Sequence, residues 1–88
     1  MRFTSSIGEE REIDLDVDRV IEYERAHPEW SLMGMMSSMD NARFSDFDIL
    51  AYLMGFDGLK DLLKSGFSIG VLSEAVQHSE VLGFTEQE

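Results

Sequence analysis

The chain has 88 residues, the size of one domain, and it contains no cysteine. Leu, Ile, Val and Phe form about 28% of it, above the roughly 20% below which highly charged chains stay unfolded. Its 18 acidic and 7 basic residues give a net charge of −11, which disfavours nucleic-acid binding because that needs Lys and Arg side chains. The missing thiol excludes disulfides, thiolate metal sites and a cysteine nucleophile.

Neither a membrane span nor an export signal is expected. No apolar run reaches the roughly 18 residues of a membrane-spanning helix. Polar Thr4, Ser5 and Ser6 interrupt the start of the chain, where a secretory signal would need an apolar stretch. We therefore expect no membrane partner and a cytoplasmic location.

Residues 2–15 are predicted to form two short strands. Phe3 and Ile7 share one parity, and Ile13 alternates with acidic neighbours, as in a half-buried strand. A turn is predicted beside Gly8, because glycine tolerates a positive φ.

The first helix is predicted from residue 17. Val17, Val20 and Ile21 have the spacing that places three side chains on one helical face. Asp16 is the expected N-cap. The helix should end near Ala26, because a proline follows two residues later.

The second predicted helix is short and rich in methionine. Its cap is Ser31, and Leu32, Met35, Met36 and Met39 follow at helical spacing. We expect this stripe to face the core.

The third helix has the clearest local signal in the chain. Ser45 and Asp48 match a capping pattern. Phe44 and Ile49 have the spacing of a hydrophobic staple across that cap. Gly55 is the expected end of the helix.

Two further helices complete the prediction. Asp57 is the expected N-cap of a fourth helix, which ends at Gly66. Ser68 is the expected N-cap of a fifth helix, which has Leu72 and Val76 on its inner face. A last apolar contact is expected from Val81, Leu82 and Phe84.

The predicted fold is therefore α+β and mostly α. A short N-terminal β-hairpin is followed by a compact bundle of four or five short helices. One domain should span residues 1–84, with the hairpin in 2–15 and the helices in 16–84, and residues 85–88 should form a frayed tail.

An aspartate triplet invites comparison with a calcium loop. Asp14, Asp16 and Asp18 match the first three ligand positions. Arg19 then occupies the position that needs glycine, and Arg25 the position that needs a bidentate carboxylate. We expect no metal site here.

No group of residues has the pattern of a catalytic or cofactor site. His27 and His78 fall on different predicted elements, whereas metal coordination needs three or four converging ligands. No nucleophile-elbow or phosphate-binding glycine motif is present. We expect no enzyme activity, no catalytic residue and no cofactor.

Residues 55–59 resemble the attachment site of acyl carrier proteins, a G-x-D-S-L pattern that carries phosphopantetheine on its serine. Gly58 stands at the serine position. Without that hydroxyl, the resemblance implies no prosthetic group.

Side chains that lie off the predicted apolar stripes are candidates for binding a protein partner. They are Trp30, Met33, Phe44 and Phe56. Methionine adapts its shape at promiscuous surfaces, and tryptophan is favoured at interface hot spots. The alternative for Trp30 is a structural anchor at the start of a helix.

The order of elements resembles a known family. The resemblance lies in three segments: Pro28-Glu29-Trp30-Ser31-Leu32 after the first helix, the apolar stretch 47–56, and the closing stretch 67–76. This arrangement is similar to the small tail assembly chaperones of tailed phages and gene transfer agents. The resemblance implies a non-enzymatic protein in the host cytoplasm that binds tape-measure or tail-tube protein and keeps it soluble.

Two other functions remain open at this point. Residues 9–24 hold eight acidic side chains against two arginines, which would suit an acidic mimic of nucleic acid that inhibits a DNA-binding protein. The chain could also be a structural subunit of a larger assembly. The sequence leaves the oligomeric state open.

Overall fold

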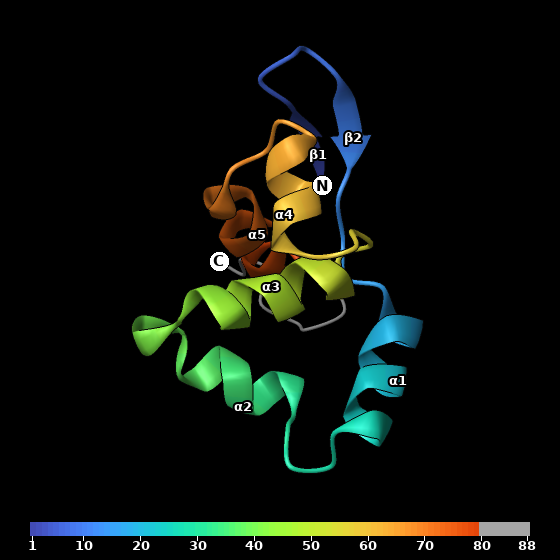
Figure 1. Cartoon of the computed structure of the whole chain (residues 1–88), viewed down its shortest axis with the longest axis vertical. Helices are drawn as coiled ribbons and strands as arrows, with labels where there is room; N and C mark the ends of the chain where they lie inside the picture. The colour runs from blue at the N-terminus through green and yellow to red at the C-terminus, as the bar shows by residue number, and fades with distance from the viewer. Residues whose placement is uncertain (80–88) are drawn as a thin grey trace.

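The computed structural model describes residues 1–79, a hairpin followed by a set of short helices (Figure 1). The elements are β1 (Arg2–Thr4), β2 (Glu10–Glu12), α1 (Val17–Ala26), α2 (Leu32–Ser37), the 3-10 helix η1 (Met39–Asn41), α3 (Phe44–Leu53), α4 (Leu59–Lys64) and α5 (Ile69–Gln77). The predicted α+β, mostly α fold is confirmed. The contact expected from Val81, Leu82 and Phe84, and the tail 85–88, lie outside the described residues.

The hairpin is antiparallel, and Phe3 lies opposite Arg11. Its strands are shorter than predicted because the turn takes up the residues between Ser5 and Glu9. The buried Ser5 hydroxyl accepts hydrogen bonds from the amides of Ile7 and Glu9 at 3.3 and 3.1 Å. Ile7 therefore belongs to the turn and is 70% exposed, and Gly8 adopts the positive φ predicted for it.

An extended segment after β2 joins the hairpin to the helices. Ile13 and Leu15 are buried in the core, which confirms the alternation seen in the sequence. The amide of Asp16 donates to the Leu53 carbonyl at 2.8 Å. This bond fixes the start of α1 at the end of α3.

Helix α1 begins and ends where the sequence predicts. The Asp16 carboxylate accepts from the amides of Asp18 and Arg19. None of the helix's residues is fully buried. On the predicted face, Val17 and Ile21 are 43% and 41% exposed, whereas Val20 is half-buried and packs against the core.

An arginine holds α1 against the rest of the molecule. The Arg19 guanidinium donates to the carbonyls of Tyr52 and Phe56 at 2.9 and 3.0 Å. Its carbon lies 4.5 Å from the centre of the Tyr52 ring. A cation at this point satisfies carbonyls at the C-terminal end of α3, where the helix dipole is negative.

Helix α3 lies at the centre of the fold and packs against α1, α4 and α5 (Figure 1). Leu50, Ala51 and Leu53 on α3 are fully buried. Around them lie the other buried hydrophobic residues, which are Ile13, Leu15, Leu32, Met35, Met54, Phe56, Leu62, Phe67, Leu72, Ala75 and Val76.

The caps of α3 and α4 differ from the prediction. Helix α3 begins at Phe44, before Ser45. Asp46 accepts from the amide ahead of it, that of Arg43, at 2.9 Å. Asp48 instead accepts from the amide of Leu59 at 2.7 Å and so caps α4 from outside. The expected caps by Ser45 and by the side chain of Asp57 are therefore wrong.

Two similar turns join α3 to α4 and α4 to α5. Gly55 and Gly66 adopt φ of 103° and 91°, and each is followed by a buried phenylalanine, Phe56 or Phe67. Each phenylalanine amide donates to the carbonyl five residues earlier, which is the Schellman arrangement. The two rings meet edge to face, 6.2 Å apart.

Across residues 1–79, no helix combines the length and the apolar character required to cross a bilayer.

Candidate protein-binding surface

The four predicted contact residues do not form one surface. Phe44 and Met33 are 74% and 56% exposed, as expected. Trp30 is half-buried and packs against the core. Phe56 is 0% exposed, so the exposure predicted for it is wrong.

The burial of Phe56 follows from the turn that carries it. The positive φ of Gly55 turns the chain back over the helices, and the edge of the Phe67 ring covers one side of Phe56. The Arg11 guanidinium lies 4.1 Å from the Phe56 ring centre. A residue directly after such a glycine commonly contacts the last turn of the helix, a signal that the sequence already contained.

Phe44 projects from the first residue of α3. Because it is 74% exposed, the hydrophobic staple predicted between Phe44 and Ile49 is wrong. Phe44 lines neither of the two pockets described below.

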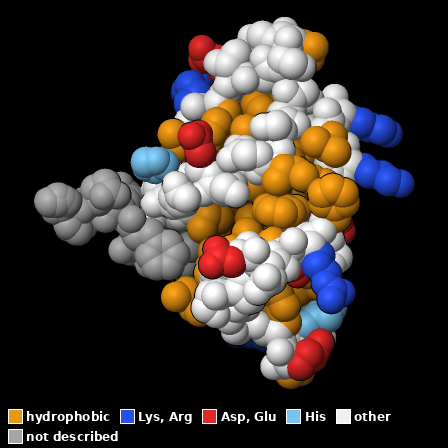
Figure 2. Space-filling view, turned by 90° about the vertical axis from the view of Figure 1, so that its left-hand side faces the viewer, with side chains coloured by type: hydrophobic (Ala, Val, Ile, Leu, Met, Phe, Trp, Pro, Cys, Tyr) orange, Lys and Arg blue, Asp and Glu red, His pale blue; other side chains and the backbone are white. Residues whose placement is uncertain are grey.

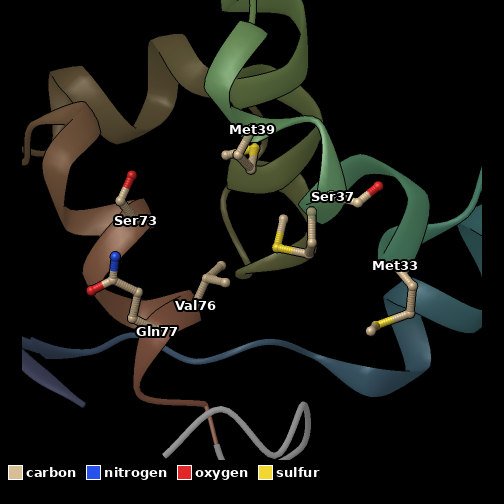
Figure 3. Close-up of a pocket in the computed structure, with 7 residues that line it drawn as sticks. Met33, Ser37, Met39, Ser73, Val76 and Gln77 are labelled. Carbon is tan, nitrogen blue, oxygen red and sulfur yellow. The ribbon is translucent and has the colours of Figure 1, made fainter.

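An open cleft of about 340 Å³ lies between the α2–η1 segment and α5. We call it the methionine pocket. Its walls are Met33, Met36, Ser37 and Met39 on one side and Ser73, Val76 and Gln77 on the other. Figure 3 shows the α5 side chains facing the methionines across this space.

The methionines divide between core and pocket. Met35 is buried, as predicted. Met36 and Met39 pack against the core but remain half-buried, and both line the pocket. The sequence assigned them to the core only. The sequence also placed Val76 on the inner face of its helix. Val76 does face inward there, toward the methionine pocket (Figure 3).

The methionine pocket offers packing surface rather than reactive groups. Its lining consists of thioethers, one branched aliphatic side chain, two hydroxyls and one amide. Flexible thioether side chains fit apolar groups of several shapes. The pocket is therefore suited to an apolar side chain of a partner.

A second, more polar cleft of about 260 Å³ lies on another side of α2. We call it the tryptophan pocket. Its lining residues are Glu29, Trp30, Ser31, Gly34, Met35, Ser38 and Asp46. It combines an indole with two carboxylates, a set that attracts cations.

Trp30 belongs to an aromatic cluster around α1. The Tyr23 ring stacks on the His27 ring, with the ring centres 4.1 Å apart, and meets the Trp30 ring edge to face, with the centres 4.8 Å apart. Burial, and then the negative charges of Glu29 and Asp48, raise the pKa of Tyr23 above its ordinary value of 10.0. Trp30 thus anchors the chain after α1 and also lines a cleft.

The aspartate triplet has structural partners. Asp14 binds the Met1 ammonium at 2.8 Å, which helps to raise the pKa of that amino group. Asp16 caps α1, and Asp18 lies in its first turn. In the described part of the chain, no three His, Asp or Glu side chains are grouped as metal ligands.

Gly58 has no room for a modified side chain. It is buried, and a Cβ atom on it would lie 2.7 Å from Oδ1 of Asp48. Residues 55–59 therefore resemble an acyl-carrier attachment site in sequence only, and the structure has no space for a modified side chain at residue 58.

Charge is unevenly spread around the two pockets. Residues 26–42 and 65–79 contain no Lys or Arg, although they include Glu29, Asp40 and Glu74. All lining residues of the two pockets except Asp46 therefore come from stretches that contain no Lys or Arg.

Hydrophobic side chains also reach the outer surface. On the face shown in Figure 2, they run together across the middle, with basic side chains at the right-hand edge and at the upper left. Among residues 1–79, the large exposed hydrophobic residues are Met1, Ile7, Val17, Ile21, Met33, Phe44 and Leu63.

None of the family models, curated proteins or solved structures with which the chain was compared matches it. We therefore infer the function from the two pockets and from the charge around them.

Proposed function

We propose that the protein is a non-enzymatic protein-binding module that acts as a tail assembly chaperone. In this role it would bind tape-measure or tail-tube protein in the host cytoplasm and keep it soluble until the tail polymerises. The observation that supports the proposal best is the methionine pocket, an open apolar cleft whose lining holds no ionisable side chain.

Two further features support a carrier that binds apolar segments. Met33 is 56% exposed at the rim of the pocket, so a partner's apolar side chain can bury it. The net charge of −11 keeps copies of the protein apart by repulsion. A solubilising partner needs both an apolar contact and resistance to its own aggregation.

The acidic-mimic alternative is less favoured by the contacts of residues 9–24. Glu12 binds the Met1 ammonium, and Glu10 lies 3.3 Å from Arg2. Asp16 caps α1, and Glu24 accepts from the amide of Leu32 at 2.9 Å. Carboxylates engaged in these local contacts are poor substitutes for an array of free phosphates.

The test is co-expression with a tape-measure protein and a tail-tube protein, followed by pull-down and pelleting. The expected result is capture of one of them and its retention in the supernatant. The combined variant Trp30→Ala, Met33→Ala should lose most of this binding, since it shortens one side chain at each pocket.

Leu63→Ala is the matched control. Leu63 is 50% exposed, close to the exposure of Met33, but it lies on α4 and lines neither pocket. Equal capture by the wild type and by the double variant would exclude the two pockets as the binding surface. Failure to capture either tail protein would refute the chaperone role itself.

A further inference from the structure

The two pockets are close neighbours because they share one helix. Met33 and Met36 line the methionine pocket, whereas Gly34 and Met35 of the same six-residue helix line the tryptophan pocket. An α-helix with its side chains is about 10 Å across, so the pockets are separated by about that distance. Two side chains seven residues apart on a helix have a similar spacing, since each residue adds about 1.5 Å.

The chemistry of the two pockets differs in a way that specifies a ligand. The methionine pocket is lined mainly by thioethers and Val76 and suits an apolar group. The tryptophan pocket places the carboxylates of Glu29 and Asp46 beside Trp30. Tryptophan is the best aromatic partner for a cation, and a carboxylate beside it strengthens the interaction by accepting charged hydrogen bonds.

The surrounding charge favours the same kind of ligand. Residues 26–42 and 65–79, which supply nearly all of the pocket lining, carry three carboxylates and no Lys or Arg. The nearest basic residues along the chain are Arg25, Arg43 and Lys64, each directly outside these stretches. A cationic segment would therefore be attracted to this side of the molecule, and an acidic one repelled.

We propose that the two pockets bind a basic amphipathic helix of a partner protein, with an apolar side chain in the methionine pocket and a Lys or Arg side chain beside Trp30. This inference rests on the proposed protein-binding function and names the chemistry of the partner. The apolar contact supplies most of the affinity, and the cation selects orientation and partner.

The probe is a synthetic amphipathic helix of about 14 residues made of Leu and Lys, because shorter peptides form helices poorly. The full-length protein is titrated with it, and Trp30, the single tryptophan of the chain, reports binding by its fluorescence. Control peptides replace every Lys by Glu, or every Leu by Ser. We expect at least tenfold weaker binding of each control peptide.

Variants separate the two pockets. Met33→Ser should weaken binding of the Leu/Lys peptide about threefold, and Met33→Ser with Met36→Ser at least tenfold. Glu29→Gln should weaken it about threefold and reduce its sensitivity to salt. Met33→Ser and Glu29→Gln change exposed side chains, so their results stand even if the double methionine variant unfolds. Leu63→Ser should bind like the wild type.

Four results would overturn the proposal. Equal affinity for the Leu/Glu peptide would remove the preference for a cation, and equal affinity for the Lys/Ser peptide would reduce binding to unspecific attraction. Binding seen only after Leu82→Ser with Phe84→Ser would assign the cleft to residues 80–88. Concentration-dependent dimers that Met33→Ser abolishes would assign it to a second copy.

The outcome for this inference is separable from that for the chaperone role. If tail proteins are captured but the Leu/Lys peptide does not bind, the cationic helix is wrong and the chaperone role survives. If the peptide binds as described but no tail protein is captured, the pockets have a different protein partner.

Discussion

The contact between Asp48 and Gly58 gives the sharpest prediction about stability. Oδ1 of Asp48 lies 2.7 Å from the amide of Leu59 and caps α4. A Cβ atom at residue 58 would lie 2.7 Å from the same oxygen. In Gly58→Ala the carboxylate must rotate away, because a carboxylate moves more easily than the backbone beneath it. The substitution therefore acts by removing the cap of α4.

The magnitude follows from two opposing effects. Losing an N-cap costs about 1 kcal/mol. The backbone at Gly58 is extended, with φ 163° and ψ −170°, and alanine there stabilises the fold by about 0.5 kcal/mol, because it restricts the unfolded chain. We expect Gly58→Ala to lower the free energy of unfolding by about 0.5 kcal/mol, or to lower Tm by about 2–4 °C.

The decisive control is the same change in the Asp48→Ala variant. With the carboxylate removed, the added methyl group has no oxygen to displace, so Gly58→Ala should now raise the free energy of unfolding by about 0.5 kcal/mol. Urea unfolding followed by far-UV circular dichroism measures all four proteins. An equal loss in both backgrounds would place the strain in the backbone and refute the role given to Asp48.

Three further predictions concern the contacts that hold the fold together. Arg19→Met should cost about 2 kcal/mol in urea unfolding, because two partly buried carbonyls, one in the last turn of α3 and one just after it, lose a charged donor; Arg25→Met on the same helix should cost less than about 0.5 kcal/mol, and equal effects would refute the role of Arg19. Gly66→Ala should destabilise by about 1–2 kcal/mol and more than Gly8→Ala. Both glycines have a positive φ, but only at Gly66 would the new Cβ lie within 3.1 Å of the hairpin turn. Stability should be full below pH 10 and fall as the pH rises through the folded-state pKa of Tyr23, which burial raises; in Tyr23→Phe this alkaline loss should be smaller, and an identical pH profile would contradict the assignment.

Local signals in the sequence were sufficient for most elements. The acid before α1 and the proline after it set the bounds of that helix, and both act on residues within one turn. The glycine that ends α3 was predicted for the same reason, since only its own φ is involved. The α+β, mostly α architecture could thus be predicted from neighbouring residues alone.

Long-range contacts explain the errors. Ser45 and Asp48 fit a capping pattern, but Asp48 caps a helix that begins eleven residues later. The role of Arg19 depends on carbonyls 33 and 37 residues away. The hydrophobic periodicity of the sequence cannot predict such partners, because a single polar contact between two distant segments produces no repeating pattern in either segment.

The candidate surface was predicted in part, for a related reason. Met33 and Trp30 line the two pockets, and helical spacing had already placed both off the core stripe. Met36 and Met39 were assigned wholly to the core. The spacing of apolar residues shows which face of a helix points inward, but it does not give the distance to the helix that lies opposite. The α5 wall of the cleft could be found only once α5 was placed opposite α2.

The contacts of Phe56 have a consequence for how a newly made chain folds. Arg11 lies over its ring, Arg19 binds its carbonyl, and the Ser6 amide donates to Gly66 in the second glycine turn. Residues 6–19 are thus held by residues synthesised some forty to sixty positions later. Their contacts are complete only after both glycine turns have been made, so this segment is made early and docks late.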